Sequence, residues 1–158
     1  MALIDDRIAQ FRAEVGDREL TEEQRKIFNA FCKKGGASTF VNITDYLGNK
    51  VRLKIVSYDP STGSQHILLS HYKTEVGNVT ATEILNLCDI VKYGESYISG
   101  VYAVYRKQYE DNGALYRTVV KISKDKGRSL LKSFYSDRGV KKILQTSLLL
   151  GNPQYGRY

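Results

Sequence analysis

Residues 101–135 constrain the fold of this chain more than any other part of the sequence. Two runs rich in β-branched and aromatic residues, 101–109 and 114–123, flank the tripeptide Asp111-Asn112-Gly113. Asn and Gly accept the positive φ angles that tight hairpin turns demand, so we predict two antiparallel strands joined here. A further turn near residues 124–127 leads into residues 129–135, which predict a third antiparallel strand.

Helical patterns precede these strands. Apolar residues recur at helical spacing over residues 3–15, and Gly16 follows as a glycine C-cap. Residues 21–24, Thr-Glu-Glu-Gln, have the capping-box pattern that opens a second helix, which ends at Gly35-Gly36. The pattern then changes to two strands, residues 39–44 and 50–58, separated by Gly48-Asn49 and therefore predicted to form a hairpin.

The middle of the chain is predicted to be helical again. Residues 64–71 predict one or two helical turns, and Thr80 or Thr82 can cap a longer helix that ends near Gly94. A short terminal helix is predicted after residue 140. We therefore expect a single α+β domain over residues 1–158, with N-terminal helices packed on an antiparallel sheet of about four to five strands. Its parts are a helical segment (1–36), an α+β core (37–148) and a polar tail (149–158).

The charge of the chain is concentrated in its last third. The formal net charge is +7, and residues 101–142 hold eleven basic side chains against four acidic ones, whereas the first 23 residues hold seven acidic and three basic ones. A localised basic excess favours a polyanionic partner such as RNA, although a solvated basic face also aids solubility. Charge alone does not decide between these two interpretations.

Several classes of protein are excluded or disfavoured. The longest apolar run is five residues, far short of the roughly 20 that a membrane-spanning helix requires. The N-terminus lacks the pattern of a secretory signal peptide, and Cys32 and Cys88 lack the spacing of a zinc or redox motif. We therefore expect a cytoplasmic protein with two buried thiols, no membrane association, no metal and no cofactor, unless it is delivered to other cells without a signal peptide.

Two histidines are the candidate acid and base groups. His66 and His71 lie five residues apart, so on a regular helix their side chains would point about 140° apart and could not both face one small site. One of them is then expected to be structural. Histidine nevertheless has the unperturbed pKa that best suits proton transfer near neutral pH.

Cationic and hydroxyl side chains share strand faces in the basic third. Arg117 and Lys121 lie on one face of their strand, and Ser133 and Tyr135 share a face of the next. Metal-independent RNA cleavage by the ribose 2′-hydroxyl needs a base, an acid and fixed positive charge near the phosphorus. The sequence supplies such groups, and it lacks the Walker A, dinucleotide-binding, H-E-x-x-H and nucleophile-elbow motifs of commoner enzymes.

These segments resemble a known superfamily. His-Ile-Leu-Leu-Ser-His (66–71), the helix at 82–91, Tyr-Arg-Thr-Val-Val-Lys (116–121) and Ser-Phe-Tyr-Ser-Asp-Arg (133–138) are similar to phage and polymorphic-toxin nucleases of the barnase, EndoU, colicin and RelE-like (BECR) superfamily. The resemblance covers roughly residues 50–145 through short motifs. It implies a ribonuclease of bacterial or phage origin, acting as a toxin or effector and restrained by an acidic antitoxin or immunity protein.

The resemblance also implies roles for particular residues. His66 or His71 would be the acid or base, Arg117 and Lys121 would bind phosphate, and Ser133 and Tyr135 would be the polar residues of the last strand. Further basic candidates for substrate binding are Arg106, Lys132 and Arg138, of which Arg138 could instead pair with the adjacent Asp137. No Glu lies on the predicted central strands, where barnase-like members place a base.

Two other functions remain open at this point. The same basic sheet and its tyrosines could bind single-stranded RNA without cleaving it. Alternatively, a phage protein could use its basic third to bind and inhibit a host protein with an acidic surface. Three results would distinguish these functions. Cleavage of RNA would identify a nuclease, and retention of intact RNA would identify an RNA-binding protein. Capture of a host protein that survives nuclease treatment would identify an inhibitor.

Overall fold

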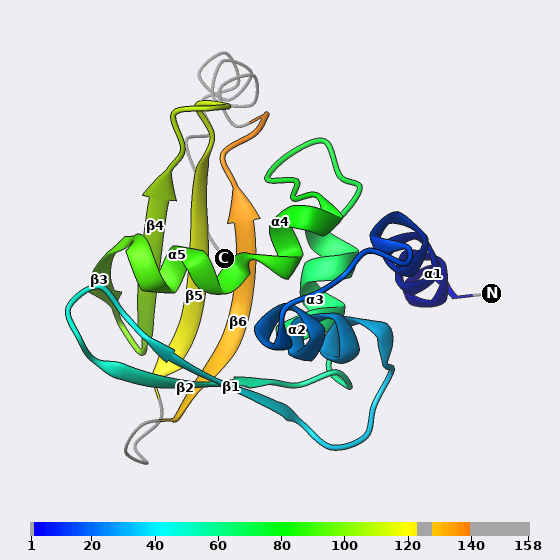
Figure 1. Ribbon diagram of the computed structural model, residues 1–158, viewed down its shortest axis with the longest axis horizontal. Coiled ribbons are helices and arrows are strands. Elements are labelled where there is room, and N and C mark those ends of the chain that lie inside the picture. Colours follow the sequence, from blue (N-terminus) through cyan, green and yellow to red (C-terminus); the bar gives the residue numbers. More distant parts are fainter. Residues whose placement is uncertain (1, 123–127, 140–158) are drawn as a thin grey trace.

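The computed structural model describes residues 2–122 and 128–139, and these form an α+β fold (Figure 1). The predicted terminal helix and polar tail lie outside the described residues. In chain order the elements are α1 (Leu3–Val15), α2 (Glu22–Cys32), β1 (Thr39–Thr44), β2 (Lys50–Ile55), α3 (Gly63–Ser70), α4 (Ala81–Leu85), α5 (Leu87–Tyr93), β3 (Glu95–Ser99), β4 (Tyr102–Gln108), β5 (Leu115–Ile122) and β6 (Arg128–Ser136).

The helix boundaries follow from local side-chain hydrogen bonds. Thr21 and Gln24 form the predicted capping box at the start of α2, and Thr80 rather than Thr82 caps α4 through a second capping box with Glu83. The single helix predicted up to Gly94 is wrong, because Asn86 divides it into α4 and α5. The Asn86 side chain donates to the Thr82 carbonyl, while its backbone N–H donates to Glu83 instead, and this local competition ends α4.

The described strands form one sheet of order β1-β2-β6-β5-β4-β3. The predicted β1–β2 hairpin and the β4–β5–β6 meander are confirmed, and Gly113 alone takes a positive φ in the Asp111-Asn112-Gly113 turn. The sheet differs from the expected one in two respects. It gains the edge strand β3, and β2 pairs in parallel with the beginning of β6, so the sheet is mixed.

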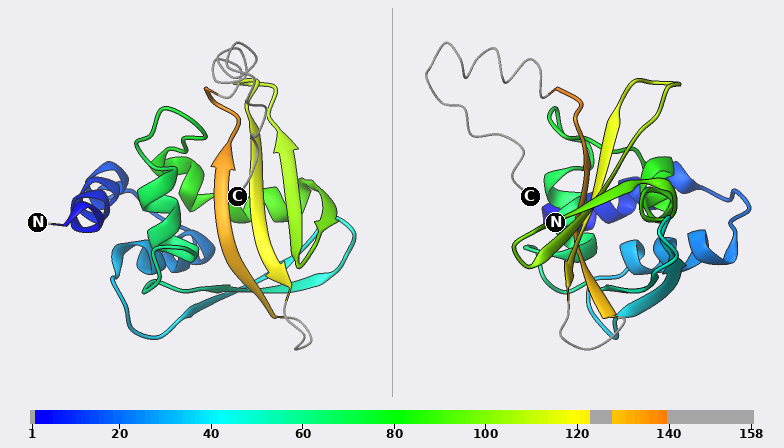
Figure 2. Two further views of the ribbon diagram at one scale, coloured as in Figure 1. Left: turned by 180° about the vertical axis from the view of Figure 1, so that it is seen from behind. Right: turned by 90° about the vertical axis from the view of Figure 1, so that its left-hand side faces the viewer.

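The described helices leave one face of β4, β5 and β6 without a helix in front of it. In Figure 1, α5 crosses the near face of these strands, and Figure 2 shows their other face from behind. The Thr118 hydroxyl of β5 donates to the Leu87 carbonyl at 3.2 Å, which fixes the start of α5 on the near face. Because side chains alternate along a strand, every second residue of this meander points to the far face.

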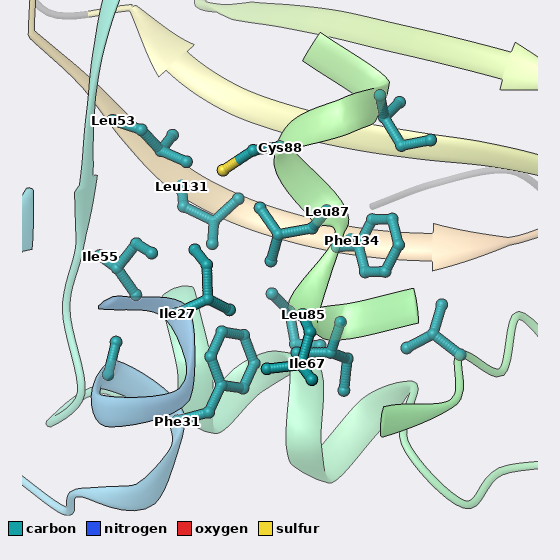
Figure 3. Close-up of a cluster of buried hydrophobic side chains, with 14 of the residues drawn as sticks. Ile27, Phe31, Leu53, Ile55, Ile67, Leu85, Leu87, Cys88, Leu131 and Phe134 are labelled. Carbon is teal, nitrogen blue, oxygen red and sulfur yellow. The ribbon is translucent and has the colours of Figure 1, made fainter. Parts of the chain in front are cut away.

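The core lies between the helices and the near face of the sheet. Figure 3 shows part of this cluster, with Leu53 of β2 near Leu131 of β6 at one side and Ile67 of α3 beside Leu85 at the other, and Ile27 and Phe31 of α2 in between. Cys88 is also buried there as a free thiol, and Cys32 is a half-buried free thiol. Because Ile67 and Leu68 are fully buried, they fix α3 against β6, and α3 carries His66 on its remaining surface.

Candidate functional site

A loop holds the end of α3 against the edge of β6. β2 pairs only with the first residues of β6, so the rest of that edge is available to other groups. The Ser136 N–H donates to the Gly77 carbonyl at 3.2 Å, and the Gly77 N–H donates to the Arg138 carbonyl at 2.8 Å. The Val79 N–H donates to the His71 carbonyl at 2.9 Å. The backbone of residues 71–79 is thereby fixed beside the C-terminal half of β6.

The two imidazoles lie side by side. The centroids of the His66 and His71 rings are 5.3 Å apart, and the rings meet edge to face. The prediction that they point away from one another is therefore wrong. It assumed a regular helix through both residues, whereas α3 ends at Ser70 and His71 has φ −131° and ψ −19°. Leaving the helix turns the His71 side chain back toward His66.

His71 also contacts the face of the sheet that carries Arg117. Its ring stacks on Tyr135, with ring centroids 5.2 Å apart and an angle of 27° between the planes. Tyr135 lies directly opposite Arg117 in the β5–β6 register, and Ser133 lies opposite Val119. Directly opposed residues of antiparallel strands share a face, so His71, Tyr135, Ser133 and Arg117 belong to one surface.

The other basic candidates, Lys132, Arg106 and Lys121, lie at different distances from the histidines. The register changes after Val119, which leaves Lys132 as the extra residue of a β-bulge. Its ammonium group donates to the Ser61 carbonyl at 2.6 Å and lies near enough to His66 to lower the pKa of that imidazole. Arg106 lies opposite Arg117, one strand further from the histidines. Lys121 is exposed four residues along β5 from Arg117, about 13 Å away along the strand.

Arg138 lies outside this surface. Its guanidinium donates to both carboxylate oxygens of Glu83 at 2.6 Å, and it also donates to the Tyr116 hydroxyl and the Asn78 carbonyl. Arg138, which we expected to bind substrate or alternatively to pair with Asp137, instead forms a bidentate pair with Glu83. The Glu83 contacts hold the pKa of Arg138 above its usual value. Arg138 therefore ties the loop at Asn78 to Glu83 of α4.

Both imidazoles are neutral at neutral pH. Burial, with a smaller contribution from His66, lowers the pKa of His71 to about 4. Burial also lowers the pKa of His66, and the Lys132 charge adds to this effect, while the Pro60 carbonyl and the Asp59 carboxylate oppose it. His71 Nδ1 is buried without a hydrogen bond, so Nε2 is the nitrogen able to reach a substrate. The Ser133 hydroxyl is likewise buried without a hydrogen bond.

Gly77 and Glu83 are two positions of the site that were not predicted from the sequence. Gly77 has a φ of +69°, and a Cβ atom there would lie 3.4 Å from His71 Nδ1 and from the Ser136 carbonyl oxygen. Nothing in the sequence around residue 77 indicates contact with a histidine, because the contact depends on the pairing of the loop with β6. The capping role of Glu83 could have been found from Thr80, three residues earlier, but its pairing with Arg138 could not.

The contact at Gly77 leads to a stability prediction. Gly77→Ala is expected to lower the free energy of unfolding by about 1–2 kcal/mol, because a side chain at this positive φ is strained. Gly113→Ala is the matched control, since Gly113 has a φ of +66° and no atom within 4 Å of the added methyl group. Both variants should lower the midpoint of urea unfolding. Only Gly77→Ala should shift the His71 imidazole resonances in NMR spectra, and unchanged resonances would contradict this packing.

The described residues contain neither a group of three or more His, Cys, Asp or Glu side chains suited to a metal ion nor a helix able to cross a membrane. Comparisons of this chain with protein-family models, curated proteins and solved structures found no match.

Proposed function

We propose that this protein is an endoribonuclease that cleaves RNA without a metal ion, by attack of the ribose 2′-hydroxyl on the adjacent phosphodiester. The observation that carries the proposal is the stacking of His71 on Tyr135, the register partner of Arg117. It brings an imidazole, a phenol and a guanidinium to one surface, and these are groups that such a reaction uses. The proposal extends to a toxin or effector acting in the cytoplasm on RNA, restrained by an acidic protein.

Each group has a role in the reaction. Neutral His71 removes the proton of the 2′-hydroxyl, and the 2′-oxygen forms a bond to phosphorus while the bond from phosphorus to the 5′-oxygen breaks. Arg117 and Lys132 offset the negative charge that develops on the phosphoryl oxygens. The pKa of His66 rises once the substrate's negative charge lies beside it, so His66 takes up a proton from solvent, and its Nδ1, the ring nitrogen that is not buried, gives that proton to the departing 5′-oxygen. The products are a 2′,3′-cyclic phosphate and a 5′-hydroxyl.

The test is incubation of purified protein with RNA in excess EDTA. Cleavage to cyclic-phosphate ends is expected, and Arg117→Ala/Lys121→Ala should slow it because the variant removes positive charge from the proposed binding surface. Arg52→Ala is the matched control, since Arg52 is an exposed arginine that stacks on Phe40 of the β1–β2 hairpin. Intact RNA with the wild-type protein, or cleavage lost in EDTA, would contradict the proposal.

A second function is favoured by one observation. A His71 pKa of about 4 is lower than the value near the working pH that makes an imidazole most effective in proton transfer. A protein that binds RNA without cleaving it does not need a titrating imidazole, because cationic and aromatic groups are sufficient for binding. RNA that is retained by the protein but stays intact would identify this alternative.

A further inference from the structure

A hollow lies at the edge of the sheet, and part of its lining faces the surface that carries Arg117 and Tyr135. It has a volume of about 440 Å³ and lies where β3 begins to pair with β4. Its lining consists of Tyr93 and Gly94 at the end of α5, Lys107 on the helix side of β4, and four further strand residues, Glu95, Arg106, Gln108 and Leu115. Glu95 lies opposite Arg106, and Leu115 lies opposite Gln108. These four strand residues therefore point to the face that also carries Arg117 and Tyr135.

A continuous row of side chains joins the hollow to His71. In the registers of β4, β5 and β6, Arg106 is opposite Arg117, and Arg117 is opposite Tyr135. Two steps across an antiparallel sheet span about 10 Å, a distance that a dinucleotide can bridge. A strand of RNA whose scissile phosphate lies at His71 can therefore cross Arg117 and reach Arg106 without leaving the surface.

The hollow offers a cation for the phosphate of a nucleotide and an aromatic ring for its base. The Arg106 guanidinium lies 5.6 Å from the centre of the Tyr97 ring and 3.7 Å from a carboxylate oxygen of Glu95. Glu95 is 77% exposed, so this ion pair is weak and a phosphate can replace it. Tyr93 is 64% exposed at the rim of the hollow, so its ring is accessible for a base to stack on.

We propose that this hollow binds one nucleotide of single-stranded RNA next to the cleaved bond, with its phosphate on Arg106 and its base on Tyr93. This inference rests on the proposed function, because that function places the scissile phosphate of the RNA at His71 and so leads the RNA toward Arg106. It also defines the substrate as unpaired RNA, because a base in an RNA duplex is stacked and paired and cannot stack on Tyr93. The protein should therefore select unpaired RNA over a duplex of the same sequence.

The affinity for RNA and its dependence on salt concentration test the Arg106–phosphate contact and the Tyr93–base contact separately. The probe is a short single-stranded RNA whose 2′-hydroxyls are methylated, so that it cannot be cleaved, with its duplex for comparison. Arg106→Ala should weaken binding and reduce the slope of log K against log salt concentration by about 0.7, the loss expected for one phosphate contact. Tyr93→Ala should weaken binding about tenfold without changing the slope, and Tyr93→Phe should restore it. Glu95→Gln should tighten binding, and Arg52→Ala should leave it unchanged.

The outcomes separate this inference from the proposed function. If the methylated RNA shows these effects but unmodified RNA is not cleaved, the hollow binds RNA and the nuclease proposal fails. If unmodified RNA is cleaved but Arg106→Ala and Tyr93→Ala bind as wild type, the hollow is not a nucleotide site. Equal affinity for the duplex, or no binding of the methylated RNA at all, also overturns the inference. Both altered side chains are exposed, so circular dichroism should show unchanged folding.

Discussion

Replacing His71 with glutamine is expected to lower the rate of RNA cleavage by a factor of about 10²–10⁴, the usual contribution of a positioned acid or base. Glutamine keeps a polar end near the position of Nε2 but cannot take up a proton. The rate of cyclic-phosphate formation under single-turnover conditions measures the loss. Because the pKa of His71 is lowered to about 4, loss of the base should lower kcat/KM only near pH 4, whereas His66, whose pKa is also lowered, loses its proton as the pH rises, so kcat/KM should decline toward pH 7.

Two controls separate loss of chemistry from loss of binding. Tyr135→Phe keeps the ring on which His71 stacks and removes only the hydroxyl, so its effect should be much smaller if the ring's role is to hold the imidazole. The affinity of His71→Gln for methylated RNA should match that of the wild type, because a neutral imidazole contributes no charge to phosphate binding. Undiminished cleavage by His71→Gln would remove His71 from the mechanism.

Much of the fold followed from local signals in the sequence. The capping box at Thr21 and the Asp111-Asn112-Gly113 turn each determine structure within a few residues, and both occur as predicted. The edge strand β3 was overlooked because its residues alternate only weakly in burial and Tyr97 and Ile98 remain exposed. Parallel pairing of β2 with β6 joins residues more than seventy positions apart, and no local pattern encodes it.

The site was predictable where it depends on strand alternation. The spacing of Arg117 from Lys121 and of Ser133 from Tyr135 predicted which residues share a face of each strand, and the register agrees for Arg117, Ser133 and Tyr135. The histidine pair was not predictable, because its geometry depends on the residue at which α3 ends. The assignment of Arg138 also required the structure, since its partner Glu83 lies 55 residues earlier on another element.

Acidification is expected to destabilise the protein through the buried histidines. His71 has a pKa of about 4 in the folded protein and an ordinary value of 6.5 in the unfolded chain. Below pH 6.5 the unfolded chain binds a proton that the folded protein does not, so the free energy of unfolding falls as the pH falls toward 4. Between pH 7 and pH 5 the loss should be about 2 kcal/mol, and the lowered pKa of His66 adds a loss of the same sign.

Urea unfolding of wild type and His71→Gln at pH 7 and pH 5 measures this contribution. The variant should lose about 2 kcal/mol less than the wild type over this interval, because glutamine does not titrate. The comparison stops at pH 5 because Glu14 and Glu83, whose pKa values are lowered in the folded protein from an ordinary 4.5, begin to take up protons in the unfolded chain below it, and the small loss they add above pH 5 is the same in wild type and variant. If wild type and variant lose stability equally, His71 titrates in the folded protein as it does in the unfolded chain. Its stacking on Tyr135 would then leave the imidazole open to water, and an exposed histidine with an ordinary pKa would be protonated too often at pH 5 to serve there as the base.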